Sequence, residues 1–149
     1  MTKEAFIDIL DEKRYSYRIE GNKIVVTSRM GVNLDALTSI PSGVKFENGG
    51  WVDLDSLTSL PPGVKFRNMG YVRLESLTSL PPGVEFENGG DVNLRALTSL
   101  PPGVEFNNRG YVYLRSLIRG GFQDWEGNIE GIDPKRLLNM MINKGLFER

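Results

Sequence analysis

The sequence contains neither cysteine nor histidine in its 149 residues. The absence of cysteine excludes disulfide bonds, thiol nucleophiles and cysteine-ligated metal sites. The absence of histidine removes the commonest general base and the commonest metal ligand. An enzyme built from this chain would have to use carboxylates, lysine or tyrosine alone. We therefore expect no catalytic activity, no bound metal and no cofactor.

Long apolar runs and a charge of one sign are also missing. No stretch approaches the roughly 18 apolar residues that a membrane-spanning helix needs. The N-terminal residues alternate charged with apolar side chains, which is unlike a signal peptide. The formal net charge is −1, so no global field draws the protein toward nucleic acid or a membrane. These features predict a soluble, cytoplasmic protein that forms one domain over residues 1–149.

The sequence does contain a repeat of 20 residues, in four full copies and a partial fifth. The unit begins at Val32 and reads V-x-L-x-x-L-T-S-L-P-P-G-V-x-F-x-N-x-G-x. Three of its columns are Phe46/Phe66/Phe86/Phe106, Asn48/Asn68/Asn88/Asn108 and Gly50/Gly70/Gly90/Gly110. Such self-similarity at a fixed period is the signature of a stacked repeat protein.

Two periodicities alternate within each unit. From Val64 to Leu74 the fixed positions are spaced by two, which is typical of a strand with one buried face. Gly70, near the middle, predicts a bend or a close backbone approach, which gives two short strands that meet at a corner. Beyond Leu74 the spacing becomes three, which predicts one tight helical turn ended by the Pro-Pro-Gly corner at 81–83. Each unit should therefore form strand, tight turn, corner, strand and bend.

The predicted fold class is mainly β, a parallel β-solenoid with leucine-rich-repeat-like coils over residues 32–118. A unit of this size cannot bury its own apolar edge, so copies must stack, with strands about 4.8 Å apart. The asparagines are spaced by two from the apolar residues of the strand, so their side chains should also point inward. We expect its amides to hydrogen-bond between coils and to satisfy backbone groups at the bend. The threonine and serine columns that begin at Thr38 and Ser39 are expected to satisfy the tight turn.

The N-terminal segment, residues 1–31, differs from the repeat, as a cap that protects a solenoid end must. A helix is predicted over 3–13, with Thr2 as its N-cap. Two alternating segments follow around Gly21 and Asn22, which indicates a hairpin. Its second strand falls on the columns of the repeat and should begin the solenoid.

The C-terminal segment, residues 119–149, carries clearer helix signals. Asp133 is a good N-cap, Pro134 fits the first helical position, and Gly145 ends the helix. We expect this helix to lie across the last coil and close it. The glycine-rich connector before it, at 119–132, contains aromatic residues that are expected to pack in the cap.

The outward positions of a solenoid are free to bind, because the inward columns hold the fold. One outward column is aromatic and is interrupted by Asp91. Exposed Trp, Tyr and Arg dominate binding hot spots, although aromatic residues also suit a strand surface for structural reasons. The candidate binding residues are the aromatic column and its Arg- and Tyr-rich surroundings: Trp51, Tyr71, Arg73, Arg95, Arg109, Tyr111, Tyr113 and Arg115.

Three functions are compatible with such a surface. The favoured one is a non-enzymatic scaffold that presents this face to another protein, with no membrane contact and with an oligomeric state that the sequence does not specify. The second is a nucleic-acid contact, but the unit 72–91 has one arginine and four acids, which breaks any basic track. The third is a carbohydrate-binding or carbohydrate-active β-helix that uses Asp53 and Asp55, about 6.6 Å apart along one strand.

Two resemblances follow from these motifs. The L-T-S-L-P segments at 57–61, 77–81 and 97–101 resemble the short leucine-rich repeats of secreted bacterial effectors. Downstream, however, Asn68 follows Phe66 by two places instead of three, so the effectors' activities do not carry over. The whole pattern, including the D-W-E-G-N-I-E-G-I-D-P-K-R-L-L end, is similar to uncharacterised proteins from bacteriophage and environmental genomes. That resemblance implies the same architecture and a phage setting, and it implies no activity.

Overall fold

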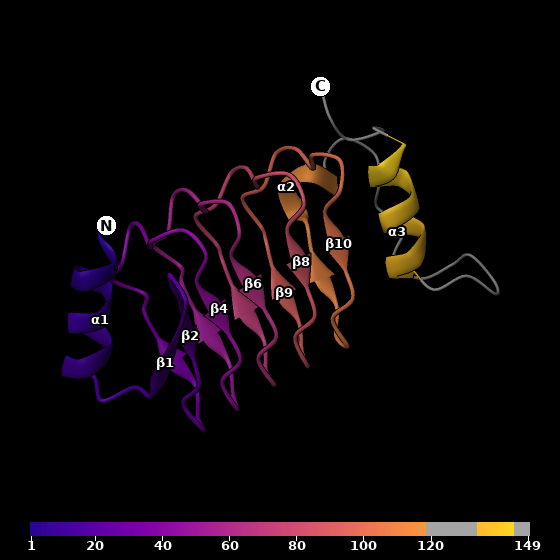
Figure 1. Ribbon diagram of the computed structural model, residues 1–149. Helices are drawn as coiled ribbons and strands as arrows, with labels where there is room; N and C mark the ends of the chain where they lie inside the picture. The colour runs from indigo at the N-terminus through magenta and orange to yellow at the C-terminus, as the bar shows by residue number, and fades with distance from the viewer. Residues whose placement is uncertain (119–133, 145–149) are drawn as a thin grey trace.

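The computed structural model describes residues 1–118 and 134–144 of the chain. The repeat forms a parallel β-solenoid, in which each unit makes one coil and gives one strand to each of two sheets (Figure 1). The six-stranded sheet contains, in spatial order, β1 (Tyr17–Glu20), β2 (Lys23–Val26), β4 (Lys45–Phe46), β6 (Lys65–Phe66), β8 (Glu85–Phe86) and β10 (Glu105–Phe106). The five-stranded sheet contains β11 (Val112–Tyr113), β9 (Val92–Asn93), β7 (Val72–Arg73), β5 (Val52–Asp53) and β3 (Val32–Asn33).

Strands of consecutive coils pair in parallel, and each residue pairs with the residue 20 positions later in the sequence. Val52 pairs with Val72 in the five-stranded sheet, and Phe66 pairs with Phe86 in the six-stranded sheet. Each sequence column therefore becomes a straight row of equivalent side chains along the solenoid. The predicted fold class is confirmed.

The interior is filled by the valine, leucine and phenylalanine columns. The four phenylalanines from Phe46 to Phe106 are at most 1% exposed. Their rings form one continuous stack, with centroids 5.3–5.4 Å apart and ring planes within 7° of parallel. Because each ring is covered by the rings of its neighbours, no coil could bury its own apolar edge alone.

Glycines stand at the corner and at the bend of each coil. Gly83 has a φ of 78° directly after Pro82, the backbone that a type II turn requires at this place and that a side chain disfavours. Gly70 lies at the bend, where a Cβ atom would come 2.7 Å from the backbone nitrogen of Trp51 in the preceding coil. The bend glycines are therefore required by close backbone approach between coils, as the pattern predicts.

The tight turn is not helical in most coils. After Leu74 a two-residue turn is closed by a hydrogen bond from the Leu77 amide to the Leu74 carbonyl, and the chain then extends toward the corner. Only the last coil forms a short helix, α2 (Arg115–Ile118). The Thr98 hydroxyl donates to the Thr78 carbonyl at 3.2 Å, so it satisfies a backbone group of the preceding coil.

The buried asparagine column satisfies the bend. Asn68 Nδ2 lies 3.0 Å from the carbonyl oxygen of Gly50 in the preceding coil, and 3.1 Å from those of Gly70 and Tyr71 in its own. The same pattern recurs at the three equivalent asparagines. The amides thus bond to backbone carbonyls, within and between coils, as predicted, and they do not form an amide-to-amide ladder.

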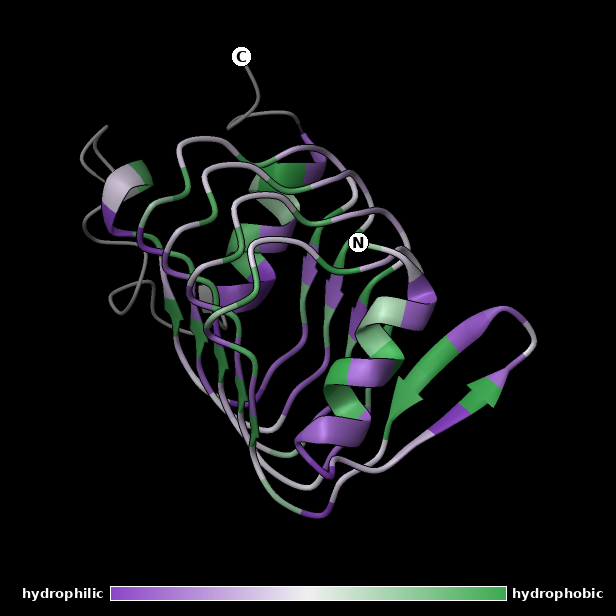
Figure 2. Cartoon of the chain, turned by 90° about the vertical axis from the view of Figure 1, so that its left-hand side faces the viewer, coloured by the Kyte–Doolittle hydropathy of each residue, from purple (hydrophilic) through white to green (hydrophobic). Residues whose placement is uncertain are grey.

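The N-terminal cap has the predicted parts. Helix α1 (Lys3–Glu12) begins after Thr2, whose hydroxyl accepts a hydrogen bond from the Ala5 amide. Its buried side chains, Phe6 and Leu10, join the core. Seen along the solenoid axis, α1 lies across the N-terminal end of the coils (Figure 2). Strands β1 and β2 form the predicted hairpin, and β2 pairs in parallel with β4, so it begins the solenoid.

The C-terminal cap is helix α3 (Pro134–Asn143), which packs against β10 at the other end of the solenoid (Figure 1). Leu138 and Ile142 are buried, and Asn139 hydrogen-bonds to both backbone groups of Phe106. The predicted closure of the last coil is confirmed. The connector at 119–132, the N-cap Asp133 and the helix end at Gly145 lie outside the described residues. In the described ranges no helix is long and apolar enough to cross a membrane.

Candidate binding site

The outer face of the five-stranded sheet carries most of the predicted binding residues. Along each strand, side chains alternate between the core and this face, so Val72 is buried while Tyr71 and Arg73 point outward. Three outward positions recur in each coil: the residue before the strand, the second strand residue and the residue two places later. We call this surface the outer face.

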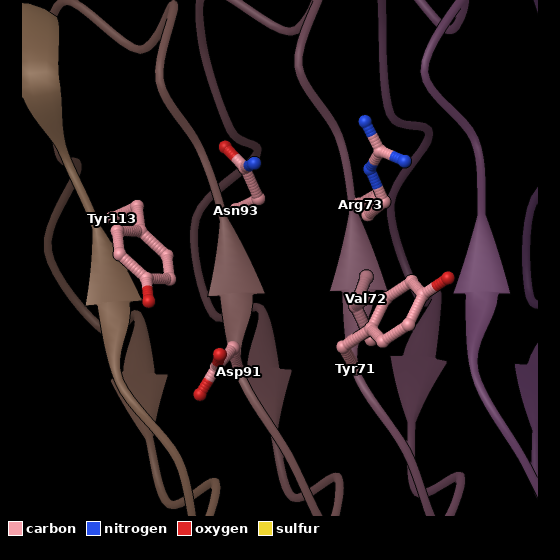
Figure 3. A pocket seen from close by; sticks show the side chains of 6 residues that line it. All are labelled: Tyr71, Val72, Arg73, Asp91, Asn93 and Tyr113. Carbon is pink, nitrogen blue, oxygen red and sulfur yellow. The ribbon is translucent and has the colours of Figure 1, made fainter.

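A shallow pocket of about 290 Å³ opens on the outer face. Side chains from three neighbouring strands line it: Tyr71, Val72, Arg73, Asp91, Asn93 and Tyr113. Figure 3 shows Tyr71 on one side and Tyr113 on the other, with Asp91 between them. We call this hollow the Asp91 pocket.

The pocket exists because an aromatic row is interrupted. Trp51 and Tyr71 stack across adjacent coils, with ring centroids 5.8 Å apart and planes within 7°. The next position in the row is Asp91, whose short side chain leaves the space of one ring empty. Its Oδ1 atom accepts a hydrogen bond of 2.8 Å from the backbone amide of Tyr111, which holds the carboxylate close to the sheet.

Arg73 lines the pocket but directs its charge elsewhere. Its Nη2 atom lies 3.0 Å from Asp55 and 3.1 Å from Glu75, and its Nη1 atom lies 3.9 Å from Asp53. Figure 3 shows the guanidinium pointing away from Asp91. The hydrogen bond with Glu75 is the main reason that the pKa of Arg73 is raised. Burial is the main reason that the pKa of the Asp55 carboxyl is raised.

The remaining polar groups around the pocket are also tied to this network. Asn93 Nδ2 donates to Glu75 at 2.9 Å, and Arg95 lies 3.9 Å from the same carboxylate. Asp53 and Asp55, the pair considered for carbohydrate chemistry, do not line the pocket. Asp53 accepts a hydrogen bond from the amide of Asp55, and Asp55 accepts one from the amide of Glu75. Both carboxylates thus stabilise the tight turns.

Acidic groups outnumber basic ones on and beside the outer face. The carboxylates are Asp35, Asp53, Asp55, Glu75 and Asp91, and the guanidiniums are Arg73, Arg95 and Arg115. Among residues 1–118 and 134–144, no three acidic side chains come together in a way that could hold a metal ion. The excess of carboxylates makes this surface complementary to a cationic ligand.

The structure brings only some of the predicted binding residues together. Tyr71, Arg73 and Tyr113 line the Asp91 pocket. Tyr111 is 66% exposed beside it, and its ring centroid lies 6.5 Å from that of Tyr113. Arg95 is exposed at the edge of the same face.

The other three predicted residues do not line the Asp91 pocket, although Trp51 and Arg115 occupy positions of the outer face. Trp51 covers the backbone of Gly31 and lines a second pocket with basic residues of the N-terminal cap, namely Lys13, Arg14 and Arg29. Arg109 lies at the bend and faces α3, where it lines a groove with Lys135 and Arg136. Arg115 is exposed at the start of α2.

Sequence reasoning did not assign Asp91, Asn93 or the buried Val72 to a binding site. Asp91 attracted notice only as a gap in the aromatic column. The gap was itself the signal, because a short side chain between two rings of a stacked row must leave a hollow of about one ring. Asn93 gave no signal, since an outward asparagine on a strand is equally compatible with solvent exposure.

Comparison of the chain with protein-family models, curated proteins and solved structures finds no match to any of them.

Proposed function

We propose that the chain is a non-enzymatic scaffold that binds a protein partner through the outer face. One observation carries the proposal. Three tyrosines, Tyr71, Tyr111 and Tyr113, are 37%, 66% and 38% exposed around a pocket on a hydrogen-bonded sheet. If this sheet served only stability, an aromatic residue at position 91 would complete the row of Trp51, Tyr71 and Tyr111 and leave no pocket.

The energetics favour recognition at this place. Tyrosine offers a large contact area with only two side-chain torsions to immobilise, so little entropy is lost on binding. The strands beneath are fixed by the ladders that join Val72 to Val52 and Val92. Exposed aromatic side chains around a pocket are the typical centre of a binding hot spot.

One observation supports the alternative of nucleic-acid binding. Trp51 shares a pocket with Lys13, Arg14 and Arg29, which places an aromatic ring next to three cations. Base stacking with phosphate contact uses these residue types. The excess of carboxylates on the outer face opposes such a ligand there, so we rank this function second. A mobility shift of single-stranded DNA or RNA that weakens steeply with salt would identify it.

The protein-binding proposal predicts a selective loss in the double variant Tyr71→Ala/Tyr111→Ala. The tagged protein is used to recover partners from cells that produce it, and a recovered protein is identified, purified and titrated by calorimetry. We expect the double variant to bind this partner roughly 30- to 700-fold more weakly, because truncating each of the two exposed tyrosines costs about 1–2 kcal/mol. Circular dichroism should show unchanged folding.

The matched control is Ile19→Ala, which truncates another large exposed side chain, in β1 of the six-stranded sheet. It should leave the affinity unchanged. A partner that binds the double variant as tightly as the wild type would overturn the proposal.

A further inference from the structure

We propose that the Asp91 pocket receives one arginine side chain of the partner, so that the partner's contact segment is short and basic. This inference rests on the proposed function and names the chemistry that the outer face recognises. Three properties of the pocket lead to it: its width, the charge at its base and the size of the surface around it.

The width of the pocket suits one planar group. Asp91 follows Tyr71 in the same row, one strand spacing or about 4.8 Å away, whereas Tyr113 lies in the neighbouring row of Arg73 and Asn93. A flat group placed over Asp91 would lie roughly 5 Å from the Tyr71 ring, with Tyr113 beside it. The protein's own stacked rings have centroids 5.3–5.8 Å apart, so such a guest would continue a packing that the chain already uses.

The charge at the base of the pocket selects a cation. Asp91 uses Oδ1 to accept the Tyr111 amide, and a carboxylate has further lone pairs to accept more hydrogen bonds. Arg73, the cation that lines the pocket, is paired with Asp55 and Glu75. An incoming cation would therefore meet an anionic site with aromatic walls, where charge-assisted hydrogen bonding and cation–π attraction act together.

Arginine fits this site better than lysine. Its guanidinium is planar, stacks on aromatic faces and donates in a fork that matches a carboxylate. The lysine ammonium is a compact, strongly hydrated charge without a flat face to stack on a ring. A guanidinium stacked on Tyr71 can donate to Asp91 at the same time.

The outer face is the size of a short segment. Five strands span about 19 Å, and the three outward positions along each strand span about 13 Å. This area is well below the roughly 800 Å² per partner of a standard interface between folded proteins. A peptide segment of a few residues with one anchoring arginine matches it.

The test is a titration of the isotopically labelled full-length chain, followed by amide chemical shifts. The probe is the peptide acetyl-Gly-Gly-Arg-Gly-Gly-amide, and the comparison peptides carry citrulline, lysine or glutamate in place of arginine. We expect saturable shifts around Asp91, Asn93 and Tyr113 with the arginine peptide. The citrulline peptide has nearly the same shape without the charge, and its binding should be about tenfold weaker or absent.

The decisive variant is Asp91→Asn, which keeps an oxygen to accept the Tyr111 amide and removes the charge. It should weaken binding of the arginine peptide by about tenfold. The matched control is Glu85→Gln in β8, which changes the net charge equally on the other sheet. It should have no effect. Equal effects of the two variants, equal binding of citrulline, or no saturable shifts at the pocket would each overturn the inference.

Failure of this inference can be told apart from failure of the proposed function. If the purified partner loses affinity for Tyr71→Ala/Tyr111→Ala but binds Asp91→Asn as tightly as the wild type, the protein-binding face stands and the arginine pocket does not. If the partner binds both variants as tightly as the wild type, both proposals fail.

Discussion

At the scale of single residues, the buried asparagines make the most specific contribution to the coil. Each places its Nδ2 group within 3.0–3.3 Å of three backbone carbonyls, at the point where the chain bends between the two sheets. The Oδ1 atoms of the four asparagines have no hydrogen-bond partner among the described residues. The fold therefore requires the Nδ2 donor of each asparagine, and aspartate, which has the same shape without that donor, should not replace it.

The variant Asn68→Asp tests this requirement. At neutral pH it directs a carboxylate toward three carbonyl oxygens, and we expect the free energy of unfolding to fall by at least about 2 kcal/mol. The introduced carboxyl should have a raised pKa in the folded state, so the lost stability should be partly recovered as pH falls and the group becomes a donor. Denaturant titration at acidic and neutral pH measures both effects.

The control is Asn22→Asp, the same chemical change at an exposed hairpin turn that tolerates aspartate. Its unfolding free energy should stay within about 0.5 kcal/mol of the wild type. If Asn68→Asp were equally mild, the asparagine column would not hold the bend.

Single residues also mark the limit of what the sequence reveals about the site. The aromatic column was predictable because alternation along the strand places its side chains on the outside, and exposed aromatic side chains indicate a binding surface. The pairing of Arg73 with Asp55 and Glu75 was not, because it depends on how the tight turns of adjacent coils face each other. The placement of Arg109 beside α3 was also hidden, since it depends on where a distant helix docks.

At the scale of elements, α3 protects the edge strand β10. The side chain of Asn139 accepts from the Phe106 amide at 2.8 Å and donates to the Phe106 carbonyl at 3.1 Å. These are the two bonds that a further strand would make. The Lys135 ammonium donates to the carbonyl of Asn108 on the same edge. An uncovered edge would offer these groups to another chain.

Replacing Asn139 by alanine should open this edge. We expect Asn139→Ala to lower the free energy of unfolding by about 1–2 kcal/mol, because two hydrogen bonds to β10 are lost. Amide hydrogen exchange at Phe106 should become faster, while exchange at Phe46, near the other end, should not change. Asn143→Ala, at an exposed position of the same helix, is the control. Unchanged exchange at Phe106 would show that the side chain does not cap the strand.

The elements themselves were largely predictable, and the exceptions have physical reasons. Thr2 and Pro134 mark helix starts that local chemistry alone determines. The spacing of three after Leu74 indicated a helical turn, yet one hydrogen-bonded turn followed by extended chain produces the same spacing. The role of Asn139 was not predictable, because a polar residue on an amphipathic helix shows its partner only after docking.

At the scale of the whole molecule, the solenoid separates stability from recognition. The inward columns are nearly uniform from coil to coil, and each coil is stabilised by its neighbours. The outward columns vary, as in the row Trp51, Tyr71, Asp91 and Tyr111. In-register stacking aligns these varied positions into one face, which is why a single aspartate in the repeat creates a pocket.

The measurement that tests this stacking most directly is the pattern of proton–proton nuclear Overhauser effects between phenylalanine rings, with one ring labelled at a time. Ring protons of Phe66 should show contacts with the rings of Phe46 and Phe86, whose centroids lie 5.4 and 5.3 Å away. They should show none with Phe106, about two strand spacings away. If contacts between Phe66 and Phe86 were missing, the coils would not lie one upon another, and no aligned outer face would exist.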